Sequence, residues 1–148
     1  MRCGPRILRS MGIDEMLMEY ARLYREGRHG EGPDAHVYDY LRERGKLWVL
    51  ASIPLRMLDY QRENESSQGR IERALAYSQR GGVFPPGVAK YRHVLRRRRA
   101  GVAFVQDGNH RTLAAEMRGD CAIAMFMPRS EYMALVEDAR YRGLVEGR

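Results

Sequence analysis

Long apolar runs are missing from this 148-residue sequence, and cysteine is rare. No run approaches the roughly 20 apolar residues that a membrane-spanning helix needs. The first ten residues carry three arginines and no apolar stretch long enough for a secretion signal. We therefore expect a cytoplasmic protein with no membrane partner. The two cysteines, Cys3 and Cys121, give neither a disulfide framework nor zinc-site spacing, and we expect Cys121 to be a small core residue.

Acidic residues are the minority among the charged ones, with 19 Asp and Glu against 26 Lys and Arg and a formal net charge of +7. This excess favours polyanionic partners such as nucleic acid, nucleotides or an acidic surface. The densest positive segment is the run Arg96, Arg97, Arg98 and Arg99. It is interpreted either as a solvated hairpin tip or as a contact with the backbone of DNA or RNA, and the sequence leaves both open.

Hydrophobic periodicity divides the chain into two regions. Apolar residues at three- and four-residue spacing predict a helix over residues 13–25. A second helix follows Pro33 and ends at Gly45. We expect residues 1–45 to form a helical extension or cap, and residues 46–148 to form the main domain.

Strand and helix patterns alternate in the second region. They predict a buried strand over residues 47–53, a helix from Ser66 or Ser67 to residue 80, and a hairpin of strands 88–91 and 102–105. A helix over residues 110–118, a strand over 122–127 and a final helix capped by Ser130 follow. The predicted fold class is α+β, a small mixed sheet with packed helices preceded by two N-terminal helices.

The segment from Asp107 to Thr112 joins a predicted strand to a predicted helix. Gly108 allows a sharp turn and a close ligand approach, and the helix start favours an anion. Arg111 can hold phosphate oxygens with two donors at once, while Asp107 can orient His110, hold Mg²⁺ or accept a proton. The alternative is a plain turn whose polar side chains bond the local backbone, and spacing alone leaves the two interpretations balanced.

The string Asp-Gly-Asn-His-Arg, followed by Thr-Leu-Ala-Ala-Glu, resembles the core motif of the ParB/sulfiredoxin-like superfamily. Other elements resemble the family in the same order. Residues 49–54 resemble the first strand of the family, and residues 67–80 resemble its first helix. Residues 82–88 match the Gly-x-x-Pro-Pro-x-Val approach to its second strand, and residues 121–127 match the strand after the motif helix. The resemblance spans roughly residues 47–127.

This resemblance implies that the chain binds ATP or CTP as a nucleoside triphosphate, with Mg²⁺. It implies nucleotide contacts at the turn, made by Gly108, Asn109, His110, Arg111 and Thr112. Asp107 matches the acidic residue that serves catalysis or metal binding in kinase-like members, and we expect His110 to act beside it. The loop after Pro54 corresponds to one that faces the nucleotide, so we also expect a phosphate contact from Arg62 and a catalytic acid at Glu63 or Glu65. A solvated polar loop is the alternative for each carboxylate.

Two departures from the family narrow the expected activity. Sulfiredoxins carry a cysteine where this chain has Asn109, which argues against repair of oxidised cysteine. Partition proteins carry DNA-binding and dimerisation segments after this domain, and few residues follow the last strand here. We therefore expect a stand-alone phosphotransferase or nucleotide hydrolase acting on nucleic acid or a nucleotide. A nucleotide-gated or simple DNA-binding module is the alternative, and nuclease activity ranks below both.

Overall fold

A six-stranded mixed sheet forms the centre of the computed structural model, which describes residues 3–27, 34–60, 69, 71–72, 75–76, 85–92 and 100–145. The strand order is β1-β2-β6-β4-β5-β3, and the pairs β6–β4 and β5–β3 are parallel while the others are antiparallel. The strands are β1 (Arg6–Gly12), β2 (Leu47–Pro54), β3 (Leu58–Asp59), β4 (Gly87–Lys90), β5 (Ala103–Asp107) and β6 (Ala122–Pro128). The predicted α+β fold with a mixed sheet is confirmed.

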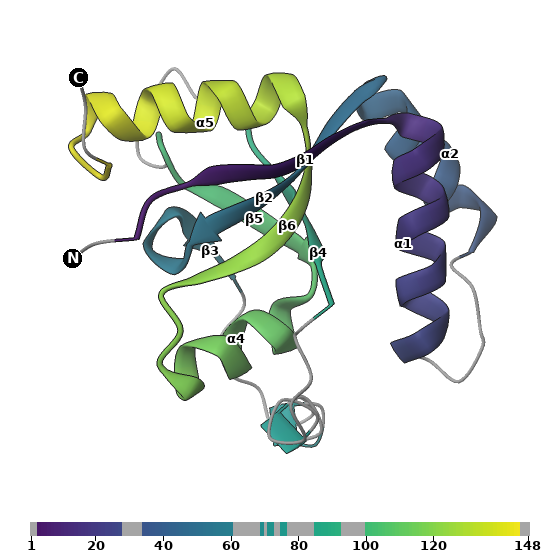
Figure 1. Cartoon of the computed structure of the whole chain (residues 1–148), viewed down its shortest axis with the longest axis horizontal. Coiled ribbons are helices and arrows are strands. Elements are labelled where there is room, and N and C mark those ends of the chain that lie inside the picture. The colour runs from purple at the N-terminus through teal and green to yellow at the C-terminus, as the bar shows by residue number, and fades with distance from the viewer. Residues whose placement is uncertain are drawn as a thin grey trace.

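Helices flank this sheet on several sides (Figure 1). They are α1 (Ile13–Gly27), α2 (Ala35–Arg44), α4 (Asn109–Arg118) and α5 (Arg129–Tyr141), with a short 3₁₀ turn η1 (Leu55–Met57). In this view α5 and α4 lie above and below the strands, and α1 and α2 stand together at one end. Helices α4 and α5 nevertheless contribute their buried residues to the same core. No helix within the described ranges is both long and apolar enough to cross a bilayer.

Alternation along the central strands creates two packed clusters. Val49 pairs with Met127 on one face of the sheet, while Leu50 pairs with Phe126 on the other. The first face belongs to the main core, which also holds the buried residues of α4 and α5. The second face packs against Met16, Leu17 and Tyr20 of α1. Trp48 is fully buried in this second cluster, so the N-terminal helices are packed directly onto the sheet.

Strand β1 is the main element that the sequence patterns missed. It pairs with β2 at the edge of the sheet, so the predicted extension contributes a strand as well as helices. All of its residues are exposed except Met11. An edge strand with so little buried surface carries no apolar alternation, and that alternation is the signal from which strands are predicted.

Several local predictions were wrong at the level of single side chains. Helix α5 begins at Arg129 with Pro128 as its N-cap residue, so Ser130 is not the cap. Cys121 is exposed because it precedes β6 instead of lying within it.

The predicted helix after Ser67 is confirmed at the described positions 69, 71–72 and 75–76, where Ile71 is buried in the core.

Arg44, the last residue of α2, ties this helix to the sheet. Its side chain is only 7% exposed, and Nη2 donates to the Ala89 carbonyl at 3.0 Å and to Glu131 Oε1 at 2.8 Å. The same carboxylate oxygen accepts the backbone N–H of Tyr91 at 2.7 Å. A buried ion pair with these extra hydrogen bonds fixes geometry more than it adds stability. It therefore sets where α2 sits relative to β4 and α5.

The start of β4 lies unusually close to the end of β5. A Cβ atom added to Gly87 would lie 2.2 Å from the Asp107 carbonyl oxygen and 3.0 Å from the Met125 sulfur. Only glycine permits this approach, because any side chain would have to push two paired strands apart. Gly87 thus determines the position of the backbone from which the turn after β5 departs.

We expect Gly87→Ala to lower the free energy of unfolding by about 2–3 kcal/mol, since relieving the overlap requires a backbone shift. Urea denaturation followed by circular dichroism measures it. Gly4→Ala is the matched control, because a Cβ at that position meets nothing within 4 Å, and we expect a change below about 0.5 kcal/mol. Equal stability of the two variants would contradict this role for Gly87.

Candidate functional site

The turn after β5 has the strand–turn–helix geometry predicted from the sequence. Strand β5 ends at Asp107, Gly108 follows in the left-handed region with φ of 100°, and α4 begins at Asn109. Gly108 is the N-cap residue and has no side chain with which to cap the first turn. The positive end of the α4 dipole is therefore directed at this turn.

Gly108 is also crowded from two sides. An added Cβ would lie 3.2 Å from Gly87 Cα and 3.3 Å from Arg111 Nη2. The positive φ and the lack of space both favour glycine here. The Arg111 guanidinium consequently packs over the bare backbone of the turn.

Arg111 is held in place by groups at both strand ends. Its Nη1 donates to the Pro85 carbonyl at 2.8 Å and lies 3.4 Å from the Pro86 carbonyl. Its Nη2 lies 3.6 Å from Asp107 Oδ2, and the side chain is 24% exposed. A guanidinium has five N–H donors, so these contacts orient the group and use only part of its capacity.

Asp107 is linked to the N-terminal helices through Tyr20. The Tyr20 hydroxyl donates to Asp107 Oδ2 at 2.8 Å, and the Tyr20 ring meets the Tyr24 ring edge-on at 5.8 Å. Burial, followed by the nearby Asp107 charge, raises the pKa of Tyr20 above its ordinary value. Both contacts of the carboxylate use Oδ2, and Oδ1 has no hydrogen-bond partner among the described residues.

The remaining residues of the motif occupy the first turns of α4. Asn109 and His110 are half-buried beside Arg111. Thr112 is fully buried, and its hydroxyl donates to the Gly108 carbonyl at 2.8 Å. The Thr112 hydroxyl therefore faces inward and closes the turn, and the expected nucleotide contact of Thr112 stays a prediction.

Other predicted site residues lie outside the described part of the chain. These are Arg62, Glu63, Glu65 and the run Arg96, Arg97, Arg98 and Arg99. Their expected contacts with phosphate or with DNA or RNA stay predictions.

Metal binding at the turn would depend on Asp107. Across the described ranges, no three His, Cys, Asp or Glu side chains gather in a cluster suited to a metal ion. A magnesium ion bound with a nucleotide needs only one or two carboxylates, since phosphate oxygens and water complete its shell. The single carboxylate with an open oxygen therefore fits Mg²⁺ carried by a triphosphate.

Two partners of the turn were not predicted from the sequence. The Pro85 carbonyl positions Arg111, whereas the sequence assigns Pro85 and Pro86 only to the approach to a strand. Tyr20 lies in the helix predicted from apolar spacing over residues 13–25, and its hydroxyl contacts a residue 87 positions away along the chain. A tyrosine in a buried apolar stripe indicates that its hydroxyl has a hydrogen-bond partner, but the pattern does not identify that partner.

We expect Tyr20→Phe to lower stability by about 1–2 kcal/mol at neutral pH, because the Asp107 carboxylate loses a buried donor. Tyr141→Phe, at a side chain that is 91% exposed, is the control and should leave stability unchanged.

The raised pKa of Tyr20 means that the folded protein keeps the phenol proton at a pH where the unfolded chain loses it. Stability should therefore fall as the pH rises above about 10, and fall less steeply in Tyr20→Phe.

Urea unfolding measured at several pH values between neutral and strongly alkaline tests both parts. Burial also raises the pKa of Tyr91, to about 12. Its titration lowers the free energy of unfolding equally in the wild type and in Tyr20→Phe at alkaline pH. Identical alkaline slopes for the wild type and Tyr20→Phe would contradict the raised pKa of Tyr20, which arises from its burial and then from Asp107.

Comparisons of this chain with protein-family models, with curated protein sequences and with solved structures gave no match. Membership of the ParB/sulfiredoxin-like superfamily therefore stays a prediction from the sequence motif.

Proposed function

We propose that the chain binds ATP or CTP through the turn at Gly108 and acts as a phosphotransferase or nucleotide hydrolase. The observation that carries the proposal is the position of Arg111. Its guanidinium is fixed over the glycine backbone at the start of α4, by the Pro85 carbonyl on one side and Asp107 on the other. A fixed guanidinium beside a helix N-terminus is a favourable arrangement for phosphate oxygens.

Prior positioning of Arg111 lowers the cost of binding. A free arginine side chain loses rotamer entropy when it grips a ligand, whereas this one is already ordered by its contacts. The glycines at positions 87 and 108 remove side chains that would separate a ligand from the backbone. The overall positive charge of the chain adds attraction for an anion at longer range.

Asp107 and His110 are the groups that we assign to chemistry. Tyr20 and Arg111 fix the orientation of the Asp107 carboxylate through Oδ2, which leaves Oδ1 to face a metal ion or the acceptor hydroxyl. Mg²⁺ would neutralise phosphate charge when bound. His110 lies in the first turn of α4, where it can donate to a phosphate oxygen or exchange a proton.

The assigned roles fit what phosphoryl transfer demands of a protein. Such catalysis rests mainly on positioning and on stabilisation of negative charge, with few covalent steps made by side chains. Arg111 and the α4 start supply the positive potential, and Asp107 orients the attacking group. Thr112 is a positioning residue, because it closes the turn through the Gly108 carbonyl.

We expect Arg111→Ala to weaken triphosphate binding by roughly 10- to 100-fold, the loss of a charge-assisted contact worth about 1.5–3 kcal/mol. Isothermal titration with ATP and with CTP in the presence of Mg²⁺ measures the change. Arg118→Ala is the matched control, since Arg118 ends the same helix, pairs with Asp120, and should leave affinity unaltered. Failure of the wild type to bind either triphosphate would refute the proposal.

We expect Asp107→Asn to reduce turnover by about 100-fold or more while triphosphate binding without Mg²⁺ changes little. The amide keeps the shape of the carboxylate and can still accept the Tyr20 hydroxyl, but it holds Mg²⁺ poorly and cannot act as a base. Release of labelled phosphate, or its transfer to candidate acceptors, measures the rate. Asp120→Asn at the far end of α4 is the control.

A wild-type protein that binds triphosphate but shows no turnover would remove the enzyme assignment and leave a nucleotide-binding module. Equal turnover in Asp107→Asn and the wild type would remove Asp107 from catalysis.

A further inference from the structure

The beginnings of β1 and β6 lie at the same end of the sheet. Both strands run antiparallel to β2, which lies between them. In the register, Arg6 pairs with Ser52 and Ala122 pairs with Pro54. Cys3 lies just before β1 and Cys121 just before β6. The topology therefore brings together the two cysteines of the chain, which are 118 positions apart.

The two cysteines are in direct contact. Cys3 Sγ donates to the Cys121 carbonyl oxygen at 3.1 Å, so the Cys3 thiol lies against the backbone of Cys121. The Cys121 carbonyl also accepts the N–H of Leu55 at 2.9 Å, so β2 anchors the backbone at Cys121. Cys3 belongs to residues 3–5, which have no regular secondary structure.

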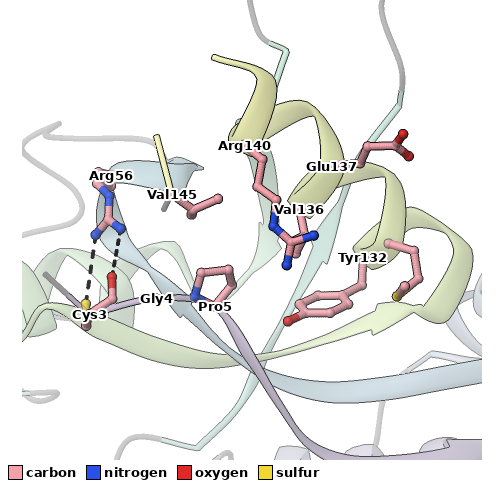
Figure 2. A pocket seen from close by; sticks show the side chains of 10 residues that line it. Cys3, Gly4, Pro5, Arg56, Tyr132, Val136, Glu137, Arg140 and Val145 are labelled. Carbon is pink, nitrogen blue, oxygen red and sulfur yellow. Dashed lines mark hydrogen bonds between the residues drawn. The ribbon is translucent and has the colours of Figure 1, made fainter. Parts of the chain in front are cut away.

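Arg56 contacts both the backbone and the sulfur of Cys3. Its Nη2 donates to the Cys3 carbonyl at 2.7 Å and its Nη1 contacts Cys3 Sγ at 4.0 Å, as the dashed lines in Figure 2 show. Its Nε donates to the Leu144 carbonyl at 2.9 Å. The guanidinium thus places positive charge beside the Cys3 sulfur.

Small oxidants can reach this pair. Cys121 is exposed and Cys3 is half-exposed. Cys3 also lines an open cavity of about 610 Å³ between the N-terminal segment and α5, with Arg56, Tyr132 and Arg140 on its walls. A thiol pair that is accessible and next to a cation has the setting of redox-active cysteines, unlike an inert buried thiol.

We propose that Cys3 and Cys121 form a reversible redox pair that closes an intramolecular disulfide. With hydrogen peroxide as the oxidant, the Cys3 thiolate attacks one peroxide oxygen and the O–O bond breaks. Cys3 becomes a sulfenic acid, and the hydroxide that leaves takes up the proton released by the thiol to give one water. The Cys121 thiolate then attacks the Cys3 sulfenic sulfur, forming the S–S bond and releasing a second water. Two thiols and one peroxide give one disulfide and two waters, and a reducing dithiol restores both thiols.

The bond would join the N-terminal segment to the start of β6 across the end of β2. It would close a loop that contains most of the chain, which restricts the unfolded ensemble strongly. We therefore expect the oxidised protein to melt about 5 °C or more above the reduced protein. This inference is independent of the nucleotide proposal, because none of the residues involved belongs to the turn at Gly108.

The test is to treat the purified wild-type chain with stoichiometric hydrogen peroxide and to analyse it without reduction. We expect both thiols to become resistant to alkylation and the mass to fall by two hydrogen atoms. Tryptic digestion should give one cross-linked species joining residues 3–6 to residues 119–129. Dithiothreitol should return the original mass and melting temperature.

Cys3→Ser and Cys121→Ser serve as matched controls, and neither should show the rise in melting temperature on oxidation. Independent alkylation of both thiols after peroxide treatment would overturn the proposal. So would oxidation that yields only disulfide-linked dimers or sulfinic acids.

Discussion

The close approach of two backbones, at the start of β4 and the end of β5, is the constraint on which the rest of the candidate site depends. Gly87 lies against the Asp107 carbonyl, and Gly108 lies against Gly87. Because no side chain separates these segments, the carbonyl of Pro85 comes within reach of Arg111 from the first turns of α4. The position of the guanidinium over the turn therefore depends on how strands β4 and β5 pack against each other. The close backbone packing thus holds the positive Arg111 guanidinium at the N-terminus of α4.

The second consequence concerns the N-terminal helices. Tyr20 reaches from α1 to Asp107, and the same helix buries Met16 and Leu17 against the sheet. Apolar packing of α1 therefore determines where the Tyr20 hydroxyl lies, and that hydroxyl orients the carboxylate assigned to chemistry. Arg44 fixes α2 in a similar way through Glu131. The packing of α1 and α2 on the sheet therefore affects the electrostatics of the candidate site.

Local patterns were sufficient to predict much of this fold. Central strands such as β2 and β6 are apolar and buried, so their composition reveals them, and the glycine at position 108 marks the turn between strand and helix. Edge strand β1 was missed because it buries only Met11. Contacts between distant positions, such as Tyr20 with Asp107 or Cys3 with Cys121, depend on topology, and no local pattern encodes them. The inward-facing hydroxyl of Thr112 likewise depends on the exact course of the turn.

Binding of a triphosphate at the turn is the central claim, and amide chemical shifts of ¹⁵N-labelled protein test it most directly. ATP and CTP would each be titrated with and without Mg²⁺. We expect saturable shifts of the amides from Gly108 to Thr112, whereas those of Gly119 and Asp120 at the other end of α4 stay unchanged. Amides of the turn that remain unmoved at millimolar triphosphate, or shifts that gather in another part of the chain, would contradict the account.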